Sequence, residues 1–208
     1  MSFATFFSNQ ARKPTGLFGR FVASQIFKKG NAEMNAFIYD SLAISDGDHV
    51  LEIGFGPGEL IHAIAGRVGS GRVEGVDFSD TMLAIAQRKN RRHIQAGRVR
   101  LHCGDFDAMS FDGRRFDLIL TVNTVYFWQQ PEATIAKIAG LLTPGGRLAV
   151  GFHPKAEMQD PILSRDVFRF YSTEEMEALL AACGAFEDIE VISRKGRSKT
   201  LHCAFGTK

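Results

Sequence analysis

A chain of 208 residues, of which 45% are hydrophobic and 23% are charged, can bury one α/β core but is too short for two domains of ordinary size. Its formal net charge of +2 and its pI near 8.5 are too small to indicate nucleic acid or a membrane surface as a partner. Three cysteines without a CxxC pair (Cys103, Cys183, Cys203) disfavour a disulfide framework and a zinc site. The chain also shows no secretory signal and no apolar run near the roughly 18 residues of a membrane span. We therefore expect one cytoplasmic domain over residues 1–208, without a metal.

The first 45 residues predict a helical cap that precedes a core over residues 46–208. After about 14 residues without periodicity, apolar residues recur at helical spacing up to Gly30, namely Phe18, Phe21, Val22 and Ile26. Asn31 is a plausible N-cap of a second helix, in which Met34, Phe37, Ile38 and Leu42 recur. Two such helices would pack on a sheet, and they could also cover a ligand there.

The stretch HVLEIGFGPGEL, residues 49–60, passes from an apolar strand through alternating glycines into a helix. Gly54, Gly56 and Gly58 lack side chains, so backbone N–H groups can approach a bound molecule. Glycine spacing alone is weak evidence for a nucleotide-type ligand. Glu52 and Glu59 add negative charge where a dinucleotide would place its pyrophosphate, so the loop suits a ligand with a cationic end.

At EIGFGPG the sequence resembles the class I S-adenosylmethionine-dependent methyltransferases, whose first motif is an acidic residue followed by alternating glycines. The resemblance implies S-adenosylmethionine as cofactor, held near Glu52, Gly54, Gly56 and Gly58. It also implies a doubly wound, mostly parallel seven-stranded α/β sheet with an antiparallel C-terminal hairpin. A second match supports it, because a Pro-Gly-Gly turn precedes the predicted fifth strand.

Asp77 ends a second predicted strand about 20 residues beyond the glycine loop. An acidic side chain there can accept hydrogen bonds from both ribose hydroxyls of a nucleoside, each worth roughly 1.5–3 kcal/mol. The competing interpretation is that Asp77 caps the next helix, but Ser79 is available for that role.

The helix predicted from Ser79 to about Arg92 presents Met82 inward, and we expect Met82 to contact the cofactor. It ends in the basic run RKNRRH, which the helix dipole explains without nucleic acid.

Asp105 follows a third predicted strand and would be an ordinary turn aspartate if judged by itself. The family resemblance implies that Asp105 accepts a hydrogen bond from the adenine amino group and that Phe106 packs along the ring.

Asn123 ends a fourth, continuously apolar strand. In the resembled family, this position faces the methionine part of the cofactor and the acceptor. The chain contains neither an N/D-P-P-Y tetrapeptide nor a Pro-Cys pair near this point, the motifs of nucleobase methylation.

His153 ends the fifth predicted strand, which follows a helix over Pro131–Leu142. If the acceptor is a hydroxyl, His153 is the first candidate for a general base and Tyr126 the second. A loop histidine without a catalytic role is the alternative. Ser172 and Glu175 then predict a capping box, and two closing strands joined at residues 195–198 predict the hairpin.

The sequence predicts a methyltransferase acting on a small molecule. Aromatic residues near the fourth and fifth strand ends suggest an acceptor pocket between the N-terminal helices, the segment after Asn123 and the connection after His153, walled by Tyr126, Phe127, Trp128, Phe168 and Phe170. Two alternatives remain open, an NAD(P)-dependent oxidoreductase and a non-catalytic S-adenosylmethionine-binding protein. The sequence does not fix the oligomeric state.

Overall fold

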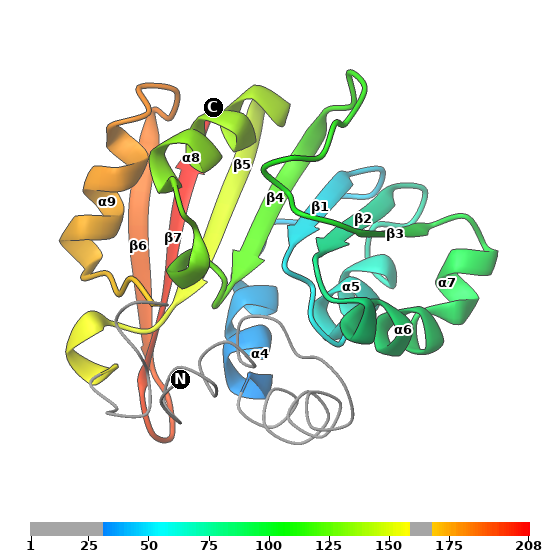
Figure 1. Ribbon diagram of the computed structural model, residues 1–208, viewed down its shortest axis with the longest axis horizontal. Coiled ribbons are helices and arrows are strands. Elements are labelled where there is room, and N and C mark those ends of the chain that lie inside the picture. The colour runs from blue at the N-terminus through cyan, green and yellow to red at the C-terminus, as the bar shows by residue number, and fades with distance from the viewer. Residues whose placement is uncertain (1–30, 159–167) are drawn as a thin grey trace.

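The computed structural model describes residues 31–158 and 168–208, and within them one sheet lies between two layers of helices (Figure 1). The helix expected between Thr15 and Gly30 lies outside the described residues. In chain order the elements are α4 (Ala32–Ser41), β1 (His49–Ile53), α5 (Glu59–Ala65), β2 (Arg72–Asp77), α6 (Asp80–Lys89), α7 (Arg91–Gln95), β3 (Val99–Cys103), β4 (Phe116–Val122), α8 (Pro131–Leu141), β5 (Leu142–Phe152), α9 (Thr173–Ala181), β6 (Asp188–Lys195) and β7 (Thr200–Thr207). Short 3₁₀ turns cover Val125–Phe127 and Lys155–Glu157.

The sheet has seven strands in the order β3-β2-β1-β4-β5-β7-β6. Strands β1 to β5 pair in parallel, whereas β7 runs antiparallel between β5 and β6. Helices connect β1 to β2, β2 to β3 and β4 to β5, a loop connects β3 to β4, and a short turn suffices for the final hairpin. This arrangement confirms the predicted fold. The strand order reverses between β1 and β4, and in open α/β sheets such a point forms a ligand crevice at the carboxyl ends.

Two apolar cores hold the helices against the sheet. On one face α4, α5 and α6 contribute Met34, Ile38, Ile61, Ile64 and Met82, all buried. On the other face α8 and α9 contribute Ile135, Ile138, Met176 and Leu180. The predicted capping box at the start of α9 is confirmed by reciprocal hydrogen bonds between Ser172 and Glu175. No helix in the described residues is long and apolar enough to cross a bilayer.

The helix predicted over residues 79–92 is wrong in extent, because it breaks into α6 and α7 at Asn90. The Asn90 side chain is fully buried and donates to the carbonyls of Gly58 and Ala86, at 3.1 and 3.0 Å. An asparagine side chain that donates to backbone carbonyls competes with the regular hydrogen bonds of a helix, so the helix ends at this position. The hydrogen bond from Asn90 to Gly58 connects the C-terminal end of α6 to the glycine loop.

Glu74, in the middle of β2, is a buried carboxylate with three basic neighbours. His49 and His102 lie 3.1 and 2.8 Å from its oxygens, and Arg114 lies at 2.6 Å. Burial raises the pKa of Glu74, but the hydrogen bonds from the two histidines and the charge of Arg114 outweigh it and lower the pKa to about 2 from 4.5. The cluster ties the loop before β4 to the sheet.

We expect Glu74 to stabilise the fold fully above pH 4.5 and to lose that contribution as the pH falls toward 2. Between these values the unfolded chain binds the proton and the folded chain does not. Glu74→Gln should therefore be less stable at neutral pH, and its stability should depend less on pH in this window. Urea unfolding at several pH values measures both effects. The exposed Glu187→Gln serves as the control, and equal pH slopes for the two variants would contradict the role of Glu74.

Candidate cofactor and acceptor site

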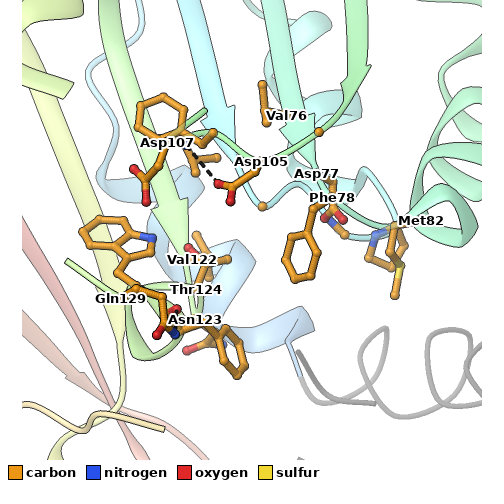
Figure 2. A pocket seen from close by; sticks show the side chains of 18 of the residues that line it. Val76, Asp77, Phe78, Met82, Asp105, Asp107, Val122, Asn123, Thr124 and Gln129 are labelled. Atoms are coloured by element: carbon orange, nitrogen blue, oxygen red, sulfur yellow. Dashed lines mark hydrogen bonds between the residues drawn. The ribbon is translucent and has the colours of Figure 1, made fainter. Parts of the chain in front are cut away.

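A cavity of about 440 Å³ opens at the carboxyl ends of β1, β2 and β4 (Figure 2). Its walls come from the glycine loop, the residues after β2, the loop after β3 and the turn after β4. The lining residues are Asn31, Ile53, Gly54, Gly56, Pro57, Val76, Asp77, Phe78, Met82, Gly104, Asp105, Phe106, Asp107, Val122, Asn123, Thr124, Phe127, Trp128 and Gln129. The cavity thus contains most of the residues that the sequence predicted for the cofactor.

The three glycines of the loop differ in what they do. A Cβ atom on Gly56 would meet nothing within 4 Å and would project into the open cavity. A Cβ on Gly54 would instead lie 2.2 Å from the Thr124 side chain. Gly58 does not line the cavity, and a Cβ there would meet the side chains of Ala86 and Asn90, each at 2.8 Å. Gly56 therefore leaves room for a ligand, while the other two allow close packing of the protein itself.

Asp77 is 7% exposed and faces the cavity from the end of β2. One carboxylate oxygen accepts the N–H of Gly56 at 2.9 Å, and the other accepts the N–H of Ser79 at 2.9 Å. Burial raises the pKa of Asp77, and these two hydrogen bonds oppose the rise. Each oxygen keeps a further lone pair for a ligand hydroxyl. Because the Ser79 hydroxyl accepts from Met82 N–H, Ser79 is the helix cap and Asp77 is not.

Glu52 does not reach the cavity, although it belongs to the strand that leads into the glycine loop. It is 3% exposed, and its Oε2 atom is buried without a hydrogen-bond partner. Burial raises the pKa of Glu52, and the nearby charge of Asp77 raises it further. Because Glu52 is not among the lining residues, its assignment to the cofactor remains a prediction.

Asp105, Phe106 and Met82 line the same cavity as Asp77. In Figure 2, Asp77, Phe78 and Met82 lie on one side, and Asp105 lies between them and Asp107. Asp105 accepts the backbone N–H of Asp107 at 3.0 Å, which orders the start of the loop after β3. The structure thus places Asp105 and Phe106, the residues predicted to contact adenine, just after the carboxyl end of β3, which neighbours β2.

The other half of the cavity is formed by Asn123 and the residues that follow it. Asn123 has a φ of 57°, a conformation that asparagine tolerates better than most residues, and it turns the chain sharply after β4. Its amide nitrogen donates to Asn31 Oδ1 at 3.1 Å, which joins α4 to the strand end. Phe127, Trp128 and Gln129 complete this wall. Asn31, Phe78 and Asp107 were not predicted as lining residues, since nothing in their local pattern marks them.

Phe168 and Phe170, predicted as acceptor walls, do not line the cavity. The Phe168 ring packs 4.8 Å from the ring of Phe127, and Phe170 stacks on Phe168 at 5.6 Å. They support the aromatic wall from behind. In the described part of the chain, the connection after His153 contributes no lining residue.

Tyr126 and His153, the predicted acid–base candidates, also lie outside the cavity lining. The Tyr126 hydroxyl accepts the backbone N–H of His153 at 2.6 Å and donates to Asn123 Oδ1 at 3.3 Å. Burial raises the pKa of this phenol, so it is a poor base. His153 Nδ1 lies 3.0 Å from the Thr200 carbonyl, and burial lowers the pKa of the imidazole. A carbonyl only accepts, so Nδ1 carries the proton and Nε2 keeps its lone pair.

We expect Tyr126→Phe to lower the free energy of unfolding by about 1–3 kcal/mol, because the His153 N–H loses its partner in a buried place. Cofactor affinity should stay near that of the wild type. Denaturation followed with calorimetric titration separates the two quantities. A variant with unchanged stability but no methyl transfer would instead restore Tyr126 as a catalytic group. His153→Ala, assayed with an identified acceptor, tests the predicted base in the same way.

Residues 50–146 match the family model of a methyltransferase domain. Nearly the whole chain is similar to the uncharacterized methyltransferase YdaC of Bacillus subtilis strain 168, with 28% identity over 187 residues that cover 90% of this chain and 98% of that protein. The family model and this relative support a class I S-adenosylmethionine-dependent methyltransferase. These similarities favour a methyltransferase over the NAD(P)-dependent oxidoreductase alternative.

Two further methyltransferases show how far the similarity extends. The ubiquinone biosynthesis O-methyltransferase of Coxiella burnetii strain RSA 493 is 33% identical over 102 residues, which cover 49% of this chain and 42% of that enzyme. The structure of magnesium protoporphyrin IX methyltransferase from Synechocystis PCC 6803, which contains S-adenosylmethionine, superposes with a TM-score of 0.68. It shares 17% identity over 100% of this chain and 98% of the other, a likeness that shows the fold alone.

Proposed function

We propose that this methyltransferase transfers the methyl group of S-adenosylmethionine to a small, compact acceptor without negative charge. The main support for this proposal is that one cavity is divided into two halves. Asp77, Phe78 and Met82 face one half, and Asn123 and Gln129 face the other (Figure 2). A cofactor in the first half would present its methyl group to a molecule in the second.

The residues of the first half fit the cofactor in their chemistry. Gly56 leaves the space that a ligand needs, and the carboxylate of Asp77 can accept both ribose hydroxyls. Asp105 can accept from the adenine amino group, and Phe106 offers an apolar ring beside it. The bound cofactor supplies a methyl group already activated on a sulfonium. The protein then needs mainly to hold the reacting groups in line, which can contribute roughly 7–11 kcal/mol.

The residues of the second half favour the proposed acceptor class. Phe127 and Trp128 provide aromatic surface, while Asn123 and Gln129 provide amide groups that donate and accept. Among the described lining residues there is no lysine, arginine or histidine to pair with a phosphate or carboxylate. RNA and DNA, whose phosphates need such cations, fit this half poorly.

Calorimetric titration tests the cofactor. We expect S-adenosylmethionine and its demethylated product to bind, and NAD not to bind. Incubation of metabolite mixtures with methyl-labelled cofactor, followed by identification of the labelled product, tests the acceptor class. Tight cofactor binding without turnover of any acceptor would favour a non-catalytic S-adenosylmethionine-binding protein, and no cofactor binding would refute the proposal.

We also propose that residues 1–208 form one domain that works in a reducing compartment, the cytoplasm. The single sheet over the described residues supports the first point. The second rests on the cysteines: Cys103, Cys183 and Cys203 form no disulfide in the structure.

A further inference from the structure

Lys137, on α8, forms hydrogen bonds with the loop that follows β3. Its ammonium group donates to the backbone carbonyls of Phe106, Asp107 and Met109, at 2.6, 2.9 and 2.8 Å. A lysine ammonium has three N–H donors, so these three bonds use all of them. The side chain thus lies on the protein side of the loop, and Lys137 is not among the residues that line the cavity.

The loop itself is a tight turn. The N–H of Met109 donates to the carbonyl of Asp105 at 3.0 Å, and the N–H of Asp107 donates to the Asp105 carboxylate. This turn directs the three carbonyls toward one point, where they repel each other unless a donor occupies it. The ammonium group supplies the donors and the opposing charge, and hydrogen bonds from a charged group are about twice as strong as neutral ones.

Two further contacts join α8 to the same loop. The Lys137 ammonium lies 4.9 Å from the centre of the Phe106 ring, within the range of a cation–π contact. One helical turn earlier, the Thr134 hydroxyl donates to the Asp107 carboxylate at 2.9 Å. Lys137 therefore fixes both the backbone and the ring of Phe106, while Thr134 fixes Asp107 in the middle of the turn.

We propose that Lys137 is a positioning residue for cofactor binding, which holds the turn over residues 105–109 so that Asp105 and Phe106 keep their places in the cavity wall. This inference rests on the proposed function, since it assumes that the two residues contact adenine. A turn that is ordered before binding need not be ordered by the ligand, so its rigidity increases affinity. Sequence patterns do not reveal Lys137, because it meets the loop only through the packing of α8.

The test compares three single variants in titrations with S-adenosylmethionine and with adenosine. Lys137→Met keeps the apolar stem and removes the donors, and we expect it to weaken both ligands about 10-fold, the effect of one charged hydrogen bond. Lys137→Arg keeps the charge and the donors, and should recover part of the loss. Lys155→Met, which removes an exposed ion pair with Glu175, is the matched control and should bind as the wild type does.

A double-mutant cycle with Asp105→Ala separates positioning from general stability. If Lys137 acts by placing Asp105, Lys137→Met should cost less affinity in the Asp105→Ala background than in the wild type. Hydrogen exchange without ligand should show faster exchange of the Asp107 and Met109 amides in Lys137→Met, and this readout needs no cofactor. Unchanged affinity in Lys137→Met, or fully additive effects in the cycle, would overturn the inference. Failure of the wild type to bind S-adenosylmethionine would instead refute the proposed function.

Discussion

Replacing Gly56 with valine is expected to weaken S-adenosylmethionine binding by at least about 100-fold. The added side chain would project into the open cavity, because a Cβ at this position meets no atom within 4 Å. Overfilling a well-packed site costs roughly 1–3 kcal/mol, and a rigid ligand that cannot move aside should suffer the upper end of that range, which corresponds to the predicted factor. Calorimetric titration of the folded variant measures the loss.

The control must account for backbone strain, because Gly56 has a φ of 51°, which a β-branched residue adopts with difficulty. Gly97 has a φ of 71° and equally open surroundings, but it lies in the exposed turn after α7, away from the cavity. Gly97→Val should therefore lower the melting temperature by a similar amount and leave cofactor affinity unchanged. If Gly56→Val binds the cofactor normally, the cofactor does not lie against the glycine loop.

The parallel strands and the final antiparallel hairpin could be predicted from the sequence because they depend on local patterns. Continuous apolar strands such as β4 belong in a sheet that is buried on both faces, and the short turn between β6 and β7 leaves only an antiparallel pairing. Asn90 shows where this approach fails. Its neighbours favour a continuous helix, but the carbonyl of Gly58, distant in sequence, draws the side chain inward and ends α6.

The cavity wall around Asp77 contains more of the residues predicted from the sequence than the wall proposed for the acceptor. Asp77 and Gly56 stand at fixed distances along one βαβ unit, so sequence spacing finds both. Asn31 lines the cavity and Lys137 binds the loop after β3, both through long-range packing for which one sequence carries no signal. Tyr126 was assigned to the acceptor on its position alone, whereas its hydroxyl is occupied by Asn123 and the backbone of His153.

Asp77→Ala is expected to weaken cofactor binding by roughly 100-fold. The carboxylate would accept two ribose hydroxyls, and two charged hydrogen bonds at the lower bound of about 1.5 kcal/mol each correspond to that factor. The substitution also leaves the N–H of Gly56 without its partner, so the loop that holds the ligand loses an anchor. Asp77→Asn should lose nearly as much. Its amide offers one oxygen and one NH₂ group, and the NH₂ would face either the Gly56 or the Ser79 N–H, both of which are donors.

A second variant distinguishes ribose binding from helix capping, the two roles that the sequence left open for Asp77. Ser79→Ala removes the hydroxyl that accepts from Met82, so it should cost about 1 kcal/mol of stability and leave cofactor affinity near the wild-type value. Adenosine and 2′,3′-dideoxyadenosine then act as probes for the hydroxyls. In the wild type, adenosine should bind more tightly, and in Asp77→Ala the difference between the two nucleosides should largely disappear. If Asp77→Ala still prefers adenosine by the same factor, another group binds the ribose, and Asp77 serves only to hold the glycine loop against α6.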